Sequence, residues 1–469
     1  MIRLSPALVA RSHVILRFLT AQSLTTALFM LYGLLCVRLL SPADYAKYVV
    51  VNGIMGALLV LMDSNFTGTL IPLVGTRVDD KQLIANYVAA LRRLSIWAYL
   101  VVGVGLIFCF PYLVHNRNWD RPTVAGMILC ILTCTWFARL AGNYFPVLMM
   151  ARDRDTWYKA QLIGSFGGIV LLLLAWGLHW LGAFQAIVIN IIGYAYMGFL
   201  GYFRSRQLLG RKGVPEPEKQ KAIIRLALPN LPQAIFFAVQ GQLSLFLITY
   251  FGHTKAVASV GALGRLGQIF AIFLTANSLL VEPYFAKLPK EKLKAHYAIA
   301  LMIGAAISIS ILLIAIRVPE LLLWALGPQY SGLQVEVKLA VGASAISCFS
   351  ALLWGIHSAR RFVYWWNVMF GIIITLITQI VFIVKTDIST VRGVLLLNLA
   401  TTAASLLVNV TAGVYGFING PREGEQPVKI TEGEAEAEAM IELAEAKSTN
   451  ISSLPQMRIT QPEIVDSET

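Results

Sequence analysis

Charged residues are scarce in this chain of 469 residues. They make up 13% of it, whereas a soluble domain usually has about 25%. Hydrophobic residues account for 57%, and the mean hydropathy is +0.69. This balance argues against an ordinary soluble protein, so chain length does not give the number of domains here.

The sequence also lacks the common motifs of enzymatic chemistry. It has no Gly-x-x-x-x-Gly-Lys-Ser/Thr loop, no His-Glu-x-x-His and no Gly-x-Ser-x-Gly, and its six histidines are scattered. The five cysteines lie in or at the ends of apolar stretches, where a thiol behaves as a small buried hydrophobe. We therefore expect a protein that is not an enzyme and holds no metal or cofactor.

Long apolar stretches are abundant instead. About twelve of them reach the ~20 residues that a membrane-spanning helix needs. They are too long for barrel strands, which predicts an all-α polytopic membrane protein. The first stretch has no cleavage site and is interpreted as a retained span. The expected spans are 18–37, 48–74, 88–113, 122–150, 159–180, 183–203, 227–251, 257–281, 294–316, 337–357, 362–384 and 391–417.

The distribution of Lys and Arg predicts the orientation. With these spans, 23 basic residues fall in loops on one side and nine on the other, which places both termini in the cytoplasm. The net charge of +13 does not indicate nucleic-acid binding: the tail Ile418–Thr469 carries −7, so residues 1–417 carry +20, mostly in short loops.

The longest internal loop divides the spans six and six. It carries seven basic residues and Gly-Val-Pro-Glu-Pro-Glu. Each half opens with a span, a short polar turn and a second span, which is typical of transporters built from repeats. The expected organisation is a bundle at 1–203, a basic linker at 204–226, a second bundle at 227–417 and an acidic tail, partly disordered, at 418–469.

Ionisable residues inside spans are the main evidence on function. Asp63 lies in the second span and Arg139 in the fourth, at similar depth in the same half. A guanidinium at the centre of a membrane helix costs about 2.5–3.5 kcal/mol on insertion scales, so it needs a partner or a wet cavity. Either the two form a salt bridge that fixes helix packing, or one of them binds an anionic head group or a coupling ion, or they do not meet.

Further candidates line the same predicted interior. Arg265 lies about two turns into the eighth span, where it either lines a cavity or reaches the interface. The seventh span is interrupted by prolines that bend a helix statically or act as a gate. The remaining cavity candidates are Gln240, Gln242 and Asn143, and the gating candidates are Pro229 and Pro232.

Short motifs in both halves resemble a known family. The turn Arg38–Tyr48 (Arg-Leu-Leu-Ser-Pro-Ala-Asp-Tyr-Ala-Lys-Tyr) is similar to that of bacterial polysaccharide flippases of the Wzx type, in the multidrug/oligosaccharidyl-lipid/polysaccharide exporter superfamily. So are Leu226–Pro229 with Gly261–Arg265, and Pro319–Tyr330. The similarity covers about residues 10–417.

This resemblance implies a V-shaped transporter of two six-helix bundles that works by alternating access. Its cargo would be an undecaprenyl-diphosphate-linked oligosaccharide for O-antigen or exopolysaccharide, driven by a proton or sodium gradient, with a polysaccharide polymerase and glycosyltransferases as partners. Relatives often carry an acid in the middle of the seventh span, where this chain has Gln240 and Gln242. The alternatives are a peptidoglycan-precursor flippase, a cation-coupled multidrug exporter and a non-transporting scaffold of a polysaccharide-synthesis complex.

Overall fold

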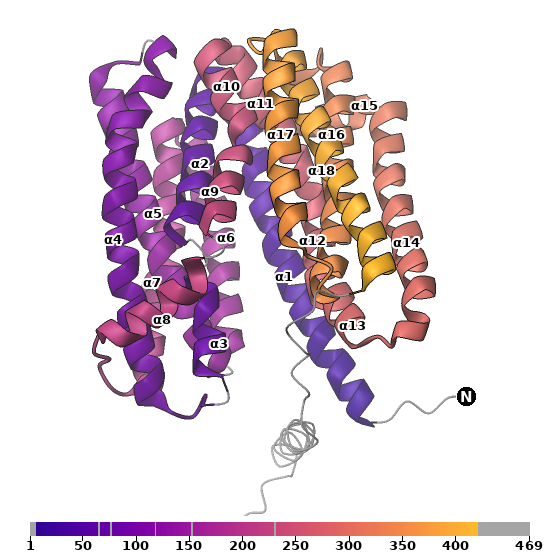
Figure 1. Ribbon diagram of the computed structural model, residues 1–469. Helices are drawn as coiled ribbons and strands as arrows, with labels where there is room; N and C mark the ends of the chain where they lie inside the picture. Colours follow the sequence, from indigo (N-terminus) through magenta and orange to yellow (C-terminus); the bar gives the residue numbers. More distant parts are fainter. Residues whose placement is uncertain are drawn as a thin grey trace, which may run out of the picture. The chain divides into compact units, whose positions relative to one another are not determined.

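The computed structural model describes residues 6–420 except 64–65, 76, 118, 152 and 229–230, and the described chain is helical without a strand (Figure 1). Ala21–Pro421 form one compact unit, which the first helix joins from Ala21 onward. Its first half contains α1 (Pro6–Leu39), α2 (Pro42–Asp63), η1 (Thr67–Thr69), α3 (Leu70–Val74), α4 (Lys81–Leu113), η2 (His115–Arg117), α5 (Arg121–Met150), α6 (Arg154–Gly177), α7 (Ala183–Leu209) and α8 (Pro217–Ala227).

The second half begins with a broken span and is equally helical. It contains α9 (Leu231–Gln240), α10 (Leu243–Phe251), α11 (Thr254–Leu266), η4 (Gly267–Phe270), α12 (Ala271–Ala276), the π-helix η5 (Asn277–Val281), α13 (Glu282–Lys287), α14 (Lys290–Arg317), α15 (Pro319–Leu326), η6 (Pro328–Tyr330), α16 (Gln334–Ala359), α17 (Trp365–Lys385) and α18 (Val391–Asn419).

The helices match the predicted spans. In the described part, ten are long and apolar enough to cross a membrane, and the bent pair α9 and α10 supplies an eleventh. The described apolar stretch of α1, Ser23–Leu39, is shorter. Each predicted span thus falls on a helix, and the prediction of an all-α polytopic membrane protein is confirmed.

Local sequence sets where several helices begin and end. The Asp80 carboxylate accepts a hydrogen bond from the Leu83 amide at 2.9 Å, which caps α4. Thr390 caps α18 in the same way through the Gly393 amide, at 3.1 Å. Proline opens α2 and α8, where its missing N–H is not needed. Gly210 ends α7 at φ +66°, a left-handed conformation that glycine adopts without strain.

Two stretches differ in detail from the expected spans. The second span, expected over 48–74, comprises α2, η1 and α3, with residues 64–65 outside the described ones. The basic linker expected at 204–226 is largely helical, because α7 continues to Leu209 and α8 follows at Pro217. The acidic tail from residue 421 lies outside the described residues, and the proposed domain boundaries stay predictions.

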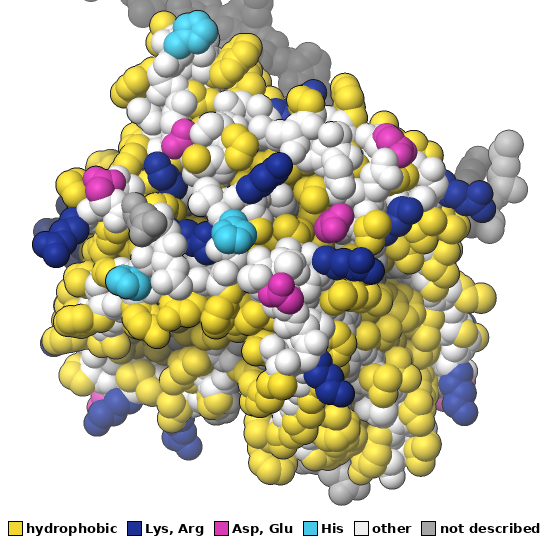
Figure 2. All heavy atoms as spheres, turned by 90° about the horizontal axis from the view of Figure 1, so that it is seen from above, with side chains coloured by type: hydrophobic (Ala, Val, Ile, Leu, Met, Phe, Trp, Pro, Cys, Tyr) yellow, Lys and Arg dark blue, Asp and Glu magenta, His cyan; other side chains and the backbone are white. Residues whose placement is uncertain are grey.

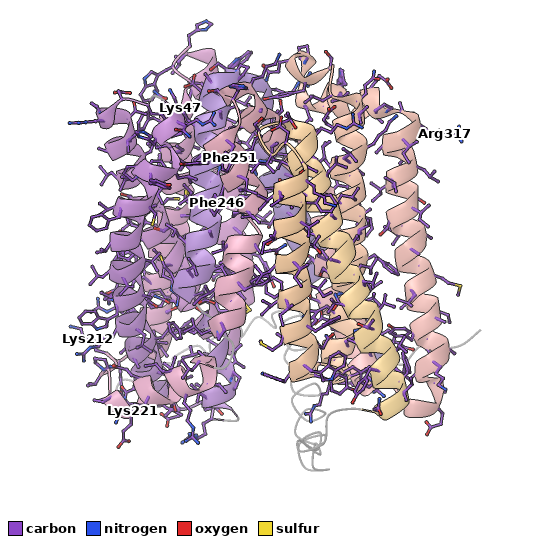
Figure 3. The ribbon with its side chains drawn as sticks, turned by 45° about the horizontal axis from the view of Figure 1, so that its top comes forward. Lys47, Lys212, Lys221, Phe246, Phe251 and Arg317 are labelled. Atoms are coloured by element: carbon purple, nitrogen blue, oxygen red, sulfur yellow. The ribbon has the colours of Figure 1, made fainter. Side chains whose placement is uncertain are left out.

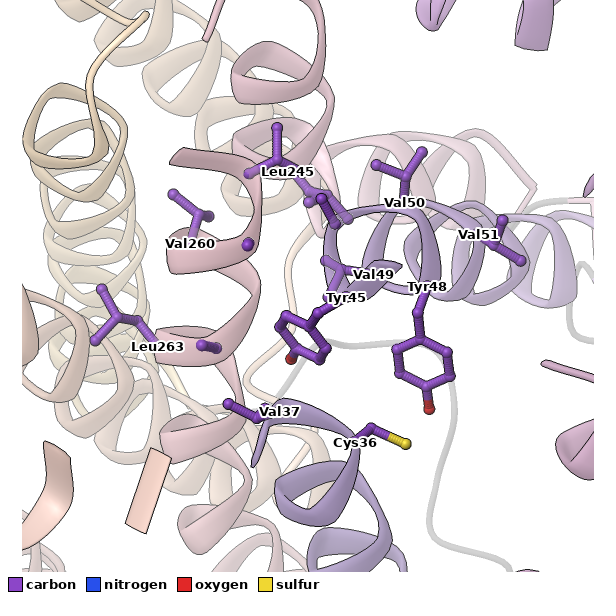
Figure 4. Close-up of a cluster of buried hydrophobic side chains, with 14 of the residues drawn as sticks. Cys36, Val37, Tyr45, Tyr48, Val49, Val50, Val51, Leu245, Val260 and Leu263 are labelled. Atoms are coloured by element: carbon purple, nitrogen blue, oxygen red, sulfur yellow. The ribbon is translucent and has the colours of Figure 1, made fainter. Parts of the chain in front are cut away.

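Each half packs around one central helix. In the first half, α5 contacts α4, α6 and α7; in the second, α16 contacts α14 and α18 (Figure 1). The halves meet where α2 contacts α9 and α11. Gly261 permits this approach, since a Cβ there would lie 2.5 Å from Val49 Cγ1. Figure 4 shows the resulting buried cluster, to which α1, α2, α10 and α11 contribute side chains.

Charged side chains mark the two ends of the bundle. Lys47 and Arg317 lie at one end and Lys212 and Lys221 at the other (Figure 3). Figure 2 views the first of these ends and shows scattered charges bordered by apolar flanks. We call the end with Lys47 the outer end and the end with Lys212 the inner end, following the predicted topology. Apolar flanks between two charged ends are what a membrane-spanning chain requires.

Candidate transport cavity

A break in the seventh span shapes the interior. Helices α9 and α10 meet at an angle of 45°, with Gly241 and Gln242 between them. The sequence reasoning placed the weak point at two prolines instead. Pro232 is the second residue of α9, where proline fits a helix start, and Pro229 lies outside the described residues. Their gating role stays a prediction, and the bend lies instead at the glycine between two glutamines.

The break opens onto a cavity of about 580 Å³ between the two halves. An adjoining cavity of about 430 Å³ in the second half shares Gln240, Ser347 and Thr402 with it. Among the described residues, no acid lines either cavity. The polar residues of the larger one are Asn52, Tyr194, Gln240, Gln242, Ser244, Arg265, Gln268, Ser344, Ser347, Asn398 and Thr402.

Arg265 is the charged residue that the described chain contributes to these cavity walls. Its guanidinium carbon lies 5.8 Å from the centre of the Tyr48 ring, and a Cβ on Gly33 of α1 would lie 3.2 Å from its Nη1. Tyr45, fully buried, is a second aromatic neighbour. No ion pair joins Arg265 to an acid of the described chain. The structure therefore places Arg265 in the cavity wall rather than at the interface, with its charge unpaired.

Asp63 and Arg139 do meet, as one of the sequence alternatives expected. Arg139 is buried, forms an ion pair with Asp63 and donates a hydrogen bond to Thr67 Oγ1 at 2.9 Å. Its Nε and Nη2 donate to Ser95 Oγ at 3.2 and 3.0 Å. The Ser95 hydroxyl contacts Asn143 Oδ1 at 3.0 Å. This network joins α2, η1, α4 and α5 within the first half.

The network lies apart from the large cavity. Arg139, Ser95 and Asn143 border a void of about 20 Å³ and line neither large cavity. Asp63 is 35% exposed in its side chain but lines neither large cavity. Of the six predicted cavity residues, the structure thus brings Arg265, Gln240 and Gln242 together in the cavity wall, while Arg139, Asp63 and Asn143 form a separate polar cluster.

Arg117 joins the halves at the outer end. This residue of η2 donates from Nε to the carbonyl of Thr249 at 2.6 Å, and from Nη2 to those of Ile248 and Gly252. Asn116 Nδ2 donates to the carbonyl of Tyr250 at 3.0 Å, and Tyr112 stacks on Tyr250. The carbonyls of Thr249 and Tyr250 lie in the last turn of α10, where the helix itself supplies few donors, and the carbonyl of Ile248 also accepts from the Gly252 amide. We call Arg117, Asn116 and Tyr112 the outer clasp; the sequence reasoning counted Arg117 only as a loop charge.

Comparison with known proteins identifies the fold. No protein-family model matches the chain, and no curated protein matches it in sequence. Its structure resembles an inward-facing multidrug resistance MATE transporter of the MOP superfamily, with TM-score 0.56 and 17% identity over 84% of this chain and 94% of that one.

Two further MATE structures are similar. One is a MATE transporter in a bent conformation, with TM-score 0.52 and 16% identity over 85% of this chain and 94% of the other. The second is the eukaryotic MATE transporter AtDTX14, with TM-score 0.53 and 13% identity over 84% and 93%. Identities this low establish the fold alone. The chain is a multi-pass membrane protein with the two-lobed helical fold of MATE transporters of the MOP superfamily.

Proposed function

We propose that this protein is an alternating-access flippase that moves a lipid-linked oligosaccharide, with an anionic diphosphate head, across a bacterial inner membrane for surface polysaccharide synthesis. The observation that carries the proposal is Arg265, a cation without an acidic partner in a cavity whose other polar groups are amides and hydroxyls. Undecaprenyl-diphosphate oligosaccharide is the cargo that the motif resemblance implies. A polymerase and glycosyltransferases are the proposed partners.

The cavity chemistry suits such a head group. Guanidinium pairs with phosphate oxygens through two parallel hydrogen bonds, and more strongly where water is displaced. Gln240, Gln242 and Asn398 offer both donors and acceptors to sugar hydroxyls. A cationic drug would meet the opposite environment, since Arg265 would repel it and no carboxylate of the walls would attract it.

The outer clasp supports an inward-facing state in this cycle. With Arg117 holding the C-terminus of α10, the halves are joined at the predicted periplasmic end. Cargo would enter from the cytoplasmic leaflet, and release to the other side would require these hydrogen bonds to break. Among the described residues, the cavity walls offer no carboxylate to a coupling proton or sodium ion.

Multidrug export is the second candidate, and the similar solved structures favour it over the flippase, because one of them is a multidrug resistance transporter. The acid-free cavity then predicts neutral or anionic compounds as cargo. A peptidoglycan-precursor flippase would share the diphosphate chemistry and differ in the sugar. A scaffold would transport nothing.

Reconstitution separates these candidates. Purified protein in vesicles would be given a fluorescent polyprenyl-diphosphate oligosaccharide in one leaflet, and its appearance in the other leaflet would be followed by quenching. We expect flipping that Arg265→Gln abolishes and that Lys212→Gln, a basic change outside the cavity, leaves intact. Accumulation of a cationic dye in the same vesicles, unaffected by Arg265→Gln, with no lipid movement would overturn the proposal.

A further inference from the structure

A second hollow lies on the flank of the second half, away from the transport cavity. It has a volume of about 500 Å³ and runs between α12–α13 on one side and α14 on the other, with α16 as its floor. No residue of this groove lines either large cavity. Its walls are mainly apolar, including Phe273, Leu280, Ile299, Ile303, Phe349 and Leu352.

The groove opens to the apolar flank of the molecule. Ile303 of α14 is 57% exposed and Leu280 is 41% exposed, although both line the groove. Helix α14 lies at the edge of the bundle in Figure 1, and its apolar window is only 11% buried. In a bilayer these side chains face hydrocarbon, so a lipid chain can reach the groove directly.

The length of the groove matches one leaflet. Along α14 it extends from His296 to Ser308, about 18 Å at roughly 1.5 Å per residue. Half of the hydrocarbon core is about 15 Å deep. A second protein helix, about 10 Å across, does not fit a hollow of 500 Å³ and this length, whereas a single lipid chain does.

The inner end of the groove is polar and basic. His296 and Tyr284 line it, with ring centres 5.8 Å apart, and His296 Nδ1 donates to the Lys292 carbonyl at 2.9 Å. The segment Lys287–Lys294 has four lysines and one acid, Glu291. In the described chain, neither Lys287 nor Lys292 forms an ion pair, and both are exposed.

The nearest other acid is already engaged. Glu282 begins α13 and accepts a hydrogen bond from Ser278 Oγ at 3.0 Å. A Cβ on Gly355 of α16 would lie 2.7 Å from Glu282 Oε1, so the carboxylate faces the bundle. The charge left at the mouth of the groove is therefore positive.

We propose that the groove binds one anionic phospholipid of the inner leaflet, with an acyl chain between α12–α13 and α14 and the phosphate at His296, Lys287 and Lys292. Basic sites between membrane helices on the cytoplasmic side recognise anionic head groups in this way. The lipid is a bound partner of the protein rather than its cargo, because the groove is separate from the transport cavity. The proposal does not depend on what the cavity transports.

Lipid titration of the purified full-length protein tests the site. Thermal unfolding in detergent would be followed with added phosphatidylglycerol or phosphatidylcholine, and native mass spectrometry would count the lipids retained. We expect phosphatidylglycerol to raise the melting temperature saturably, with one molecule retained per protein, and phosphatidylcholine to have no such effect. The double variant Lys287→Gln/Lys292→Gln should raise the apparent Kd about thirtyfold, since each lysine contributes roughly fivefold near an anionic lipid.

Two controls make the result specific. The pair Lys212→Gln/Lys221→Gln removes two charges from the inner end of the other half and should leave the affinity unchanged (Figure 3). Ala300→Phe fills the groove and keeps the lysines, and should lower lipid retention at least tenfold; if it fails to fold, the lysine pair still decides. Equal effects of both phospholipids, equal losses in both lysine pairs, or a retained polyprenyl lipid in place of phospholipid would overturn the proposal.

Discussion

Two arginines inside the membrane span region have opposite surroundings. Arg139 is enclosed by Asp63, Thr67 and Ser95, which use all three nitrogens of its guanidinium. Arg265 faces a cavity of about 580 Å³ and has no acidic partner in the described chain. A charge that is fully partnered contributes to the fold, whereas one left without a counter-ion in a wet cavity is available to a ligand.

Removal of Arg139 should have the largest effect. In Arg139→Met, Asp63 loses its counter-ion and Ser95 loses two hydrogen bonds, and breaking a buried pair on one side costs about 3–5 kcal/mol. We expect the lower end of this range, because the Asp63 side chain is 35% exposed. Thermal unfolding in detergent measures the loss, and transport should fall only as far as the amount of folded protein falls.

The double variant Asp63→Asn/Arg139→Met provides the matched control. It removes both charges, so most of the lost stability should return, together with transport. If transport stays absent in a well-folded double variant, the pair has a role in the transport cycle and the comparison with Arg265 fails.

Substitution of Arg265 should lower transport and leave stability almost unchanged, the reverse of what we expect for Arg139. Arg265→Gln removes a half-buried charge that no acid of the described chain balances, so we expect unchanged or slightly higher stability. Loss of a charged hydrogen bond of about 1.5–3 kcal/mol should lower the affinity for an anionic cargo roughly 10- to 100-fold. Arg265→Lys keeps the positive charge but cannot form two parallel hydrogen bonds with a phosphate, so it should recover part of the affinity for the cargo. The measurement is cargo binding beside a melting curve; a large fall in melting temperature would contradict the proposed division.

The sequence predicts the helices well, but it predicts the surroundings of Arg139 and the bend beside the Arg265 cavity only in part. The helices follow from long apolar stretches, and the equal depth of Asp63 and Arg139 makes their meeting one of the alternatives that the sequence allows. Ser95 and Thr67 could not be found in this way, because single hydroxyls are common in membrane helices and only the fold brings them to Arg139. The bend at Gly241 could not be predicted either. A single glycine within a helix does not determine whether the helix bends, because that depends on the packing of neighbouring helices.

A third arginine, Arg117 of the outer clasp, can be compared with Arg139, which has hydrogen-bond partners, and with Arg265, which has no acidic partner in the described chain. Arg117 donates to the carbonyls of Ile248 and Thr249 in α10 and of Gly252 directly after it, so its hydrogen bonds are satisfied like those of Arg139, but across the two halves. Arg117→Ala should remove about 1.5–3 kcal/mol from the clasped state, which shifts its equilibrium with an open state roughly 10- to 100-fold. Spin labels at Arg121→Cys and Lys255→Cys, with Cys109→Ser, should then report longer distances. Lys385→Ala, another basic change at the outer end, should leave the distances unchanged.

Removal of the ion pair Asp153–Arg204, at the inner end, should have the smallest effect on stability. It shows how much an exposed ion pair contributes compared with the buried pair of Arg139. Burial raises the pKa of the Asp153 carboxyl, but hydrogen bonds from Thr156 and Arg204 outweigh it and hold the pKa below its usual value. A depressed pKa stabilises the fold above the unfolded value of about 3.9, and this stability is lost as pH falls below it.

Because Arg204 is 42% exposed, Asp153→Asn should cost less than about 1 kcal/mol at pH 7. Melting curves of variant and wild type should therefore nearly coincide at neutral pH and converge fully in acid. A loss as large as that of Arg139→Met would mean that enclosure by the membrane helices is not what makes the Arg139 pair important.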